Sequence, residues 1–228
     1  MQQDVQRFRQ TYRRQIAHTY RAWRRGACVA ALGLGLMALF LASANDIHAL
    51  EYSAVVLTLL ALNMGEYWVH KNLGHFKRRF GRLFYKRHTG DHHSFFSHTQ
   101  MRYEQMRDFR VILFPVWLVL VQGAGAGVLY LALCWLNSNI ASLVAATWVG
   151  GYLLYELFHA LEHLPDRHLL SRLPWVAQMR TLHALHHRRD LMHSHNFNIV
   201  FPLSDWLFGT LYWETKQPVE RVSTTTKT

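Results

Sequence analysis

Histidine is unusually frequent in this chain, with 16 in 228 residues, and ten of them fall into four short clusters. The clusters read HKNLGH, HTGDHH, HALEH and HALHH. They contain His70, His75, His88, His92, His93, His159, His163, His183, His186 and His187. In a helix, side chains three or four positions apart project from one side, so two such imidazoles could reach one metal ion.

Imidazole combined with few thiolates suits iron, zinc, copper or nickel, and one ion takes about four to six ligands. Ten clustered histidines therefore predict two ions. The alternative is that these are ordinary polar residues at a membrane surface. That alternative crowds many groups able to become cationic into a chain whose formal charge is already +11. Metal binding keeps imidazoles neutral, so we interpret the clusters as metal sites.

The spacing inside two clusters decides how their members are expected to pair. His88 and His92 lie four positions apart and should share one side of a helix. His70 and His75 lie five apart, which suits an α-helix less well. We therefore expect the helix to break near Gly74, or these two histidines to serve different ions.

Acidic residues close to the clusters could hold the second ring nitrogen of a ligand histidine. They are Glu156, Asp91, Glu162 and Asp190. For Glu162 and Asp190, an ordinary surface charge is an equally good interpretation.

Four apolar stretches could carry the clusters to one place. They are residues 27–44, 52–69, 111–136 and 140–158. The first has no charge over 18 positions, which gives about 27 Å of helix against a bilayer core of about 30 Å. A composition of 50% hydrophobic residues with a net charge of +11 also fits a soluble enzyme poorly. The sequence predicts an all-α integral membrane protein with four transmembrane helices.

Basic residues mark the side on which each connector lies. Lysine and arginine number 7 in residues 1–26, 10 in 71–110 and 8 in 159–228, and the connectors 45–51 and 137–139 have none. The positive-inside rule then places both termini and a helical cap carrying the histidines in the cytoplasm. The glycines at 123–127 could form a hairpin turn, which would give five membrane passes. A fifth pass would place one of the segments rich in Lys and Arg on the outer side of the membrane, against the positive-inside rule. We interpret the glycines as close helix packing.

The predicted domain organisation has three parts. Residues 1–26 read as a basic amphipathic helix on the anionic inner membrane surface, or alternatively as a solvated basic tail. Residues 27–215 form one membrane-embedded domain, and residues 216–228 a disordered tail. No cleaved signal peptide is expected. Cys28 and Cys134 are far apart, form no CxxC pair and read as small apolar packers.

Residues 52–213 resemble the fatty acid hydroxylase and sterol desaturase superfamily of integral-membrane histidine-box oxygenases. The resemblance rests on an HX4H box after an apolar helix, a second box ending in HH, GYLLYELFHALEH, HALHH and the closing NFNIVFPLSDWLFGT. One departure is that the second box here is HX3HH, where the family commonly has HX2HH. With this departure His88 would pair with His92 at i+4 instead of i+3 and still face the same way.

The resemblance implies that the ten clustered histidines ligate two iron ions, with zinc able to replace iron in a purified sample. It also implies His98 and His195 as additional ligands, with His193 behind them, and Asn196 as a residue that binds water near the metal. O₂ would be the co-substrate.

The implied activity is O₂-dependent hydroxylation of a C–H position on a membrane lipid, such as an acyl chain, by a non-haem di-iron centre. Desaturation of a lipid or sterol is the alternative that the boxes leave open. A zinc-dependent membrane hydrolase would be expected to carry HExxH, and HALEH does not. A metal transporter would place charged residues near the bilayer midplane, where this chain has few.

No haem-binding or iron–sulfur motif is recognisable, so we expect a separate electron donor of ferredoxin or cytochrome b5 type with its reductase. The arginines follow the membrane topology, and no nucleic-acid motif accompanies them, so no nucleic-acid partner is expected. A multi-pass protein of the bacterial inner membrane is favoured, with the ER membrane as the alternative.

Overall fold

The computed structural model describes residues 2–214, and within them the chain is helical, with a single isolated β-bridge between Ser97 and Gln100. The all-α prediction is therefore confirmed for this part of the chain. The longer helices are α1 (Gln2–Arg14), α2 (Ala22–Leu41), α3 (Ser53–Val69), α7 (Trp117–Leu133), α8 (Ser138–Glu162) and α9 (Pro174–His186). The short helices are η1 (Ala49–Tyr52), α4 (Arg82–Tyr85), α5 (His93–Phe95), η4 (Met106–Asp108), α6 (Phe109–Ile112), η5 (Leu169–Arg172) and α10 (Leu203–Leu207). The predicted tail, 216–228, lies outside the described residues.

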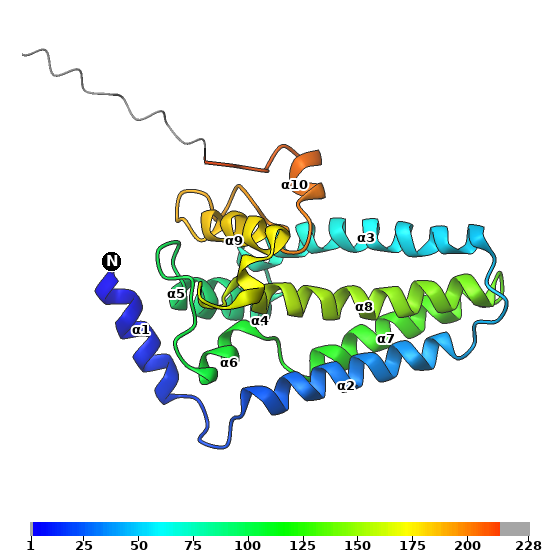
Figure 1. The fold of residues 1–228 in the computed structure, drawn as a ribbon, viewed down its shortest axis with the longest axis horizontal. Helices are drawn as coiled ribbons and strands as arrows, with labels where there is room; N and C mark the ends of the chain where they lie inside the picture. The colour runs from blue at the N-terminus through cyan, green and yellow to red at the C-terminus, as the bar shows by residue number, and fades with distance from the viewer. Residues whose placement is uncertain (1, 215–228) are drawn as a thin grey trace, which may run out of the picture.

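Helices α2, α3, α7 and α8 lie side by side, with α8 in contact with each of the other three (Figure 1). Glycines permit this close approach. A Cβ atom on Gly123 of α7 would lie 2.6 Å from Leu36 of α2, and one on Gly151 of α8 would lie 2.4 Å from Leu62 of α3. Helix α7 runs unbroken through its glycines, which agrees with close packing and not with a hairpin turn.

Three helical segments are long and apolar enough to cross a membrane: Ala22–Leu41, Met106–Leu133 and Ser138–Glu162. The remaining predicted span corresponds to α3, which is shorter at 17 residues. The segment Met106–Leu133 is interrupted, because α6 and α7 are separated by residues 113–116, which include Pro115. Large apolar side chains such as Leu34, Val56 and Leu131 point outward from the bundle, as expected for a lipid-facing surface.

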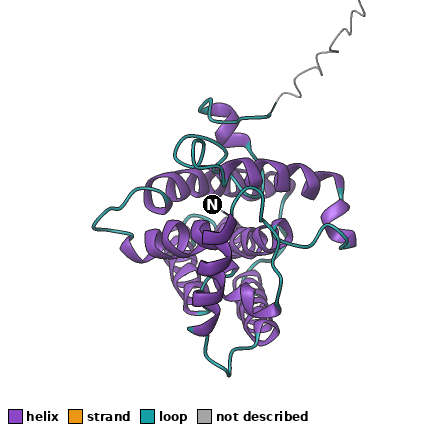
Figure 2. Cartoon of the chain, turned by 90° about the vertical axis from the view of Figure 1, so that its left-hand side faces the viewer, coloured by secondary structure: helices purple, strands orange, loops and turns teal. Residues whose placement is uncertain are grey.

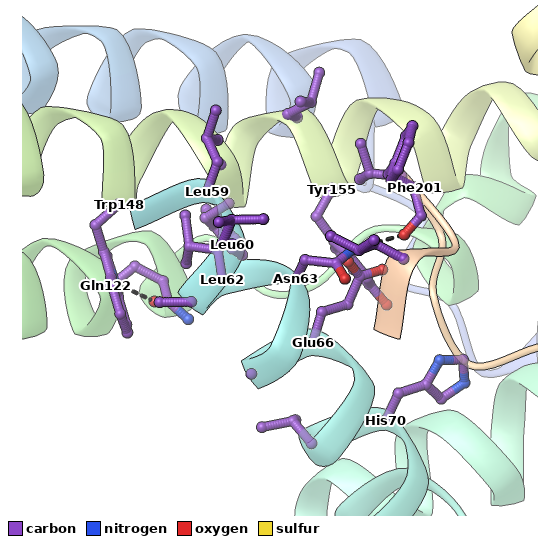
Figure 3. Close-up of a pocket in the computed structure, with 18 of the residues that line it drawn as sticks. Leu59, Leu60, Leu62, Asn63, Glu66, His70, Gln122, Trp148, Tyr155 and Phe201 are labelled. Carbon is purple, nitrogen blue, oxygen red and sulfur yellow. Dashed lines mark hydrogen bonds between the residues drawn. The ribbon is translucent and has the colours of Figure 1, made fainter. Parts of the chain in front are cut away.

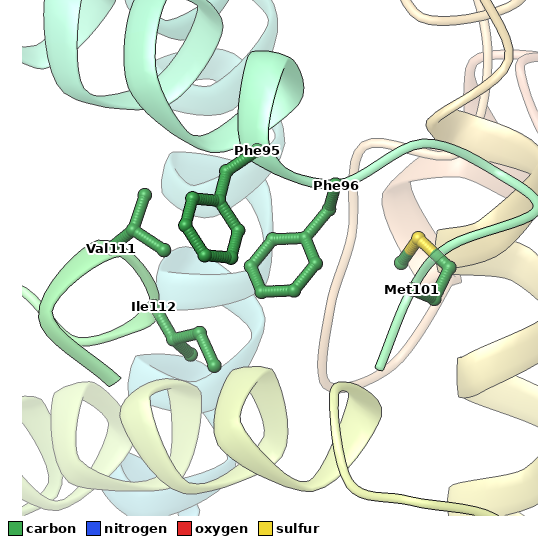
Figure 4. Packing of buried hydrophobic residues seen from close by; sticks show 5 residues of the cluster. All are labelled: Phe95, Phe96, Met101, Val111 and Ile112. Atoms are coloured by element: carbon green, nitrogen blue, oxygen red, sulfur yellow. The ribbon is translucent and has the colours of Figure 1, made fainter. Parts of the chain in front are cut away.

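Apart from η1, which directly precedes α3 at the opposite end, the short helices and α9 gather at one end of the bundle and form a helical cap, residues 70–112 and 163–210 (Figures 1 and 2). Part of its core is a cluster of buried side chains (Figure 4). They are Phe95, Phe96, Met101, Val111 and Ile112.

Helix α1 packs against this core with Phe8 and Tyr12, and Tyr12 makes an edge contact with Phe95 at 5.6 Å between ring centroids. Within the predicted segment 1–26, helix α1 ends at Arg14 and α2 begins at Ala22, with no helix at 15–21. The aromatic side chains of α1 cover the protein's own cap. This corrects the expectation that the face rests on the membrane, because burial against an aromatic core removes that surface from contact with lipid.

Candidate metal centre

The clustered histidines converge into two groups at the cap end of the bundle. The first cluster is His70, His75, His88, His93 and His186, whose ligand nitrogens lie within 4.8 Å of one another. His92, His163, His183 and His187 form a second such group. His159 stands next to it, with its Nε2 atom 3.3 Å from Nε2 of His92. The second cluster is hereafter His92, His159, His163, His183 and His187.

Several Nε2 atoms converge at hydrogen-bond distance, and a single N–H hydrogen can satisfy only one of the contacts that each central nitrogen makes. In the first cluster, Nε2 of His88 lies 2.8, 3.1 and 3.0 Å from Nε2 of His70, His75 and His93. In the second, Nε2 of His187 lies 2.8 Å from His183 and 3.1 Å from His92. Two nitrogens bound to one ion at right angles, each at about 2.1 Å, are about 3.0 Å apart.

The opposite ring nitrogen, Nδ1, is held by an acceptor in five of these histidines. A carbonyl or carboxylate oxygen can only accept, so Nδ1 carries the proton and Nε2 keeps a free lone pair. The pairs are His70 with Phe197 O, His163 with Met101 O at 2.7 Å, His186 with His195 O at 2.9 Å, His187 with Phe96 O at 3.0 Å and His183 with Glu162 Oε2 at 2.5 Å. In these five histidines the converging Nε2 atom therefore carries a lone pair, which is the donor that a metal ion requires.

Unpartnered polar atoms in the same place support this conclusion. Nε2 of His163 and Oε1 of Glu162 are buried and have no hydrogen-bond partner among the described residues. A buried polar group without a partner is costly. Since Nδ1 of His163 already donates to Met101, its Nε2 atom is free to bind a cation. The two clusters therefore fit metal ions.

Burial also keeps the imidazoles neutral. Desolvation lowers the pKa of His70 and of His187 to about 3. It lowers the pKa of His88 and His186 well below the usual value. Neutral imidazole is the ligand form, so no proton has to be displaced near neutral pH before a metal binds.

Two π-helical turns set the spacing of the first two boxes. The turns are η2 (His70–Gly74) and η3 (Lys86–His92). Five positions advance an α-helix by about 1.4 turns, which points the side chains apart, whereas π-helical hydrogen bonds join residues i and i+5. The turn η2 ends at Gly74, where a break was expected, and both His70 and His75 enter the first cluster.

The same geometry overturns the pairing expected in the second box. His88 joins His93, five positions on, in the first cluster, while His92 belongs to the second. The expectation that His88 pairs with His92 assumed an α-helix, and the π-helical turn η3 replaces it. The extra residue of HX3HH is therefore accommodated by local backbone geometry.

The additional ligands implied by resemblance lie outside both clusters. His98 is exposed. The ring of His195 lies against Tyr212, with its Nδ1 atom 2.8 Å from Ser194 Oγ, so His195 contributes its backbone carbonyl to His186 and not its imidazole. His193 is also exposed, with its ring 5.5 Å from that of His75.

Three expected supporting residues have other roles in the structure. Glu156 accepts from the Tyr152 hydroxyl at 2.6 Å and from the Phe114 amide at 3.2 Å, which ties the α6–α7 break to α8.

Asp91 is half-buried, and this burial raises its pKa against the charges of Arg87 and Lys86. Asn196 is buried and bonds to backbone atoms of Tyr212 and Leu182, so its amide fastens the end of the described chain. For Glu156 and Asn196, hydrogen bonds satisfy the side chain, and sequence proximity to a box did not reveal those partners.

The fold decides between the alternatives left open for two acidic residues, and it reveals a third. Glu162, an open alternative from sequence, holds His183, whereas Asp190 pairs with Arg188 at the surface. Asp205 accepts from the amides of Phe197 at 3.0 Å and Asn198 at 2.7 Å. It thereby fixes the Phe197 carbonyl that holds a first-cluster imidazole. Asp205 is the acidic residue of the closing motif NFNIVFPLSDWLFGT, and this was the only sequence signal for its role. No spacing rule links its position to a histidine box.

Two cavities reach the clusters from different directions. An apolar cavity of about 530 Å³ lies between α3, α7 and α8 and reaches His70. In Figure 3, Gln122 and Trp148 lie at the end of this cavity remote from His70, joined by a hydrogen bond of 2.9 Å. A second cavity of about 340 Å³ is more polar and touches His93 and His187, with α1 along one side.

The family model described as fatty acid hydroxylase matches residues 55–210. Neither the comparison with curated proteins nor that with solved structures gave a significant match. The matched segment contains every histidine of both clusters, together with Glu162 and Asp205.

Proposed function

Because the chain belongs to the fatty acid hydroxylase family, we propose that this membrane oxidoreductase hydroxylates an unactivated C–H bond of a membrane lipid, using O₂ and two iron ions. The observation that carries the proposal is the convergence of Nε2 lone pairs in two buried clusters. Each cluster offers five imidazoles, so each would hold one ion. Bound iron would supply the activation of O₂.

The protein's own residues would orient the ligands and the substrate. Carbonyls and Glu162 hold the Nδ1 protons, which keeps the Nε2 atoms directed inward. The reaction balances when one oxygen atom enters the C–H bond and the other leaves as water, with two electrons and two protons added. We propose that the electrons come from a separate ferredoxin or cytochrome with its reductase.

The apolar cavity supports a lipid chain as substrate. Its lining is largely aliphatic and aromatic, and it lies within the bundle, where a chain could enter from the bilayer without crossing water. His70 lies at its cap end. A chain in this cavity would present its C–H bonds to the first cluster while burial keeps water away.

We further propose that α3 crosses the membrane as a fourth span. It lies alongside α8 and exposes Val56, Leu57 and Leu60. The Lys and Arg distribution favours a cytoplasmic cap. A bacterial inner membrane is the proposed location, with the ER membrane as the alternative.

The test combines metal analysis of anaerobically purified protein with lipid mass spectrometry of expressing cells supplied with ¹⁸O₂. We expect two irons per chain and a lipid that gains one ¹⁸O atom. His186→Ala should abolish the product because it removes a first-cluster ligand, whereas His18→Ala, an exposed histidine far from the boxes, should not.

Other outcomes would change the assignment. A lipid that loses two hydrogens without gaining oxygen would make the protein a desaturase. Zinc at full occupancy, with no lipid change and no need for O₂, would contradict the oxygenase and favour a zinc hydrolase or a transporter.

A further inference from the structure

The side chain of Arg9 on α1 is buried, with 2% of its surface exposed, and all three guanidinium nitrogens are engaged. Its Nε atom donates to the carbonyl of Phe95 at 2.9 Å, and one Nη atom donates to the carbonyl of Gln100 at 2.7 Å. The other Nη atom donates to Glu104 at 2.6 Å, and this carboxylate balances the buried charge. One arginine thus fastens three points of the segment 95–104 to α1.

Phe95 and Gln100 offer backbone carbonyls to Arg9, and the carbonyl of the next residue in each case holds an imidazole of the second cluster. Phe96 accepts from Nδ1 of His187 at 3.0 Å, and Met101 accepts from Nδ1 of His163 at 2.7 Å. Phe96 is extended, with φ −115° and ψ 135°, and successive residues of an extended chain face opposite sides. Arg9 therefore holds one side of the segment while the imidazoles bind the other.

We propose that Arg9 is a positioning residue for the second cluster. By fixing the Phe95–Phe96 and Gln100–Met101 peptides, it sets the tautomer and the orientation of His187 and His163. This inference rests on the proposed metal centre and adds to it a residue of α1, which precedes the segment 55–210 covered by the family model.

The segment depends on Arg9 because it has little regular structure of its own. Residues 96–105 form no helix, and their one β-bridge joins Ser97 to Gln100. The Arg9 guanidinium carbon also lies 5.0 Å from the ring centroid of Phe95 and 5.3 Å from that of Phe96. These cation–π contacts hold the same two residues whose carbonyls matter here.

The test is an anaerobic cobalt(II) titration of the purified full-length chain, followed by release into a competing chelator. We expect two ions per wild-type chain. In Arg9→Met, the second-cluster ion should leave at a chelator concentration about tenfold lower, the usual scale for loss of an outer-shell partner. The first-cluster ion should be unaffected. The visible-spectrum component that is lost should match the one absent from His163→Ala, and not the one absent from His75→Ala.

Arg13→Met is the matched control. Arg13 lies one turn further along α1 and binds Glu104 at 2.8 Å and Asp108 at 2.7 Å, so it also anchors the helix, but through side chains only. We expect wild-type ion release from this variant. Arg9→Lys keeps the charge, but its three N–H donors sit on one compact nitrogen and lack the planar fork that reaches the separated acceptors of Arg9. Arg9→Lys should release the second-cluster ion at a chelator concentration between those of the wild type and Arg9→Met. If Arg9→Met does not fold, Arg9→Lys replaces it in the test.

Two results would overturn the positioning role. One is release of the second-cluster ion at the same chelator concentration from Arg9→Met and Arg13→Met. That result would mean that Arg9 has no effect beyond any shared contribution to the docking of α1. The other is parallel loss of both ions from Arg9→Met. A wild-type chain that binds fewer than two ions would instead refute the proposed centre, and this inference with it, before any change at Arg9 is considered.

Discussion

At the scale of single residues, a hydrogen-bond acceptor at Nδ1 keeps the ring proton on that nitrogen and leaves the Nε2 lone pair free to bind a metal. Most of the identified acceptors are backbone carbonyls, which no side-chain substitution removes directly. The exception is His183, whose Nδ1 atom lies 2.5 Å from Glu162. Both side chains are almost fully buried, so the contact operates in a region of low dielectric, where electrostatic interactions are strong.

We therefore expect Glu162→Gln to weaken metal binding at the second cluster by about 10- to 100-fold. The amide keeps the shape, but its oxygen is a weaker acceptor for the Nδ1 proton than a carboxylate oxygen, which makes His183 a weaker donor to a metal. Metal content after dialysis against graded chelator measures the effect. Glu214→Gln, which removes an exposed carboxylate paired with Arg188, is the control. Equal metal retention in the two variants would refute the role of Glu162.

At the scale of elements, the contact between α3 and α8 shapes the apolar cavity. Gly151 of α8 faces Leu62 of α3, and both residues line the cavity. A Cβ atom at position 151 would lie 2.4 Å from Leu62 Cδ1, so the leucine side chain would have to move. Since the leucine is flexible and the backbone is not, the cavity wall would adjust first.

Gly151→Ala should therefore narrow the cavity and lower kcat/KM for the lipid about tenfold, since a methylene-sized change in an apolar pocket is worth about 1–3 kcal/mol. The variant's substrate preference should shift towards lipids with shorter or less bulky chains, which mass spectrometry of the products would record. Gly127→Ala is a matched control, because nothing lies within 4 Å of its added Cβ. An unchanged product profile in Gly151→Ala would remove this cavity from the substrate path.

At the scale of the whole molecule, the long helices alternate in direction, so both clusters lie at one end of the bundle (Figure 1). The connectors at 42–48 and 134–137 lie at the other end. This arrangement separates a polar, metal-binding cap from an apolar bundle. It places the proposed oxidation at the boundary between them, where a lipid chain and a soluble donor can both approach.

The proposed four-span topology predicts opposite labelling of two engineered cysteines. In a chain with Cys28 and Cys134 replaced by serine, Arg78→Cys should react with an impermeant maleimide only from the cytoplasmic side. Ser43→Cys should react only from the other side. Both positions are exposed and flank α3. Labelling of both from one side would show that α3 does not cross the membrane.

Much of this architecture could be predicted from sequence because it depends on local pattern. Apolar runs of span length identified α2, α7 and α8, although α2 begins earlier than expected, at Ala22, and α7 later, at Trp117. The amphipathic spacing in residues 1–26 predicted a helix, but not the surface that it covers.

The sequence by itself determined which imidazoles gather, because two boxes end apolar helices that can emerge on one side, and the other two lie in basic segments assigned to that same side. Only the tertiary structure decided how they divide, since π-helical turns assign His88 and His93 to one cluster and His92 to the other. It also decided the supporting contacts of Arg9, Glu162 and Asp205. Those contacts join segments distant in the chain, and periodicity carries no information about which distant surfaces meet.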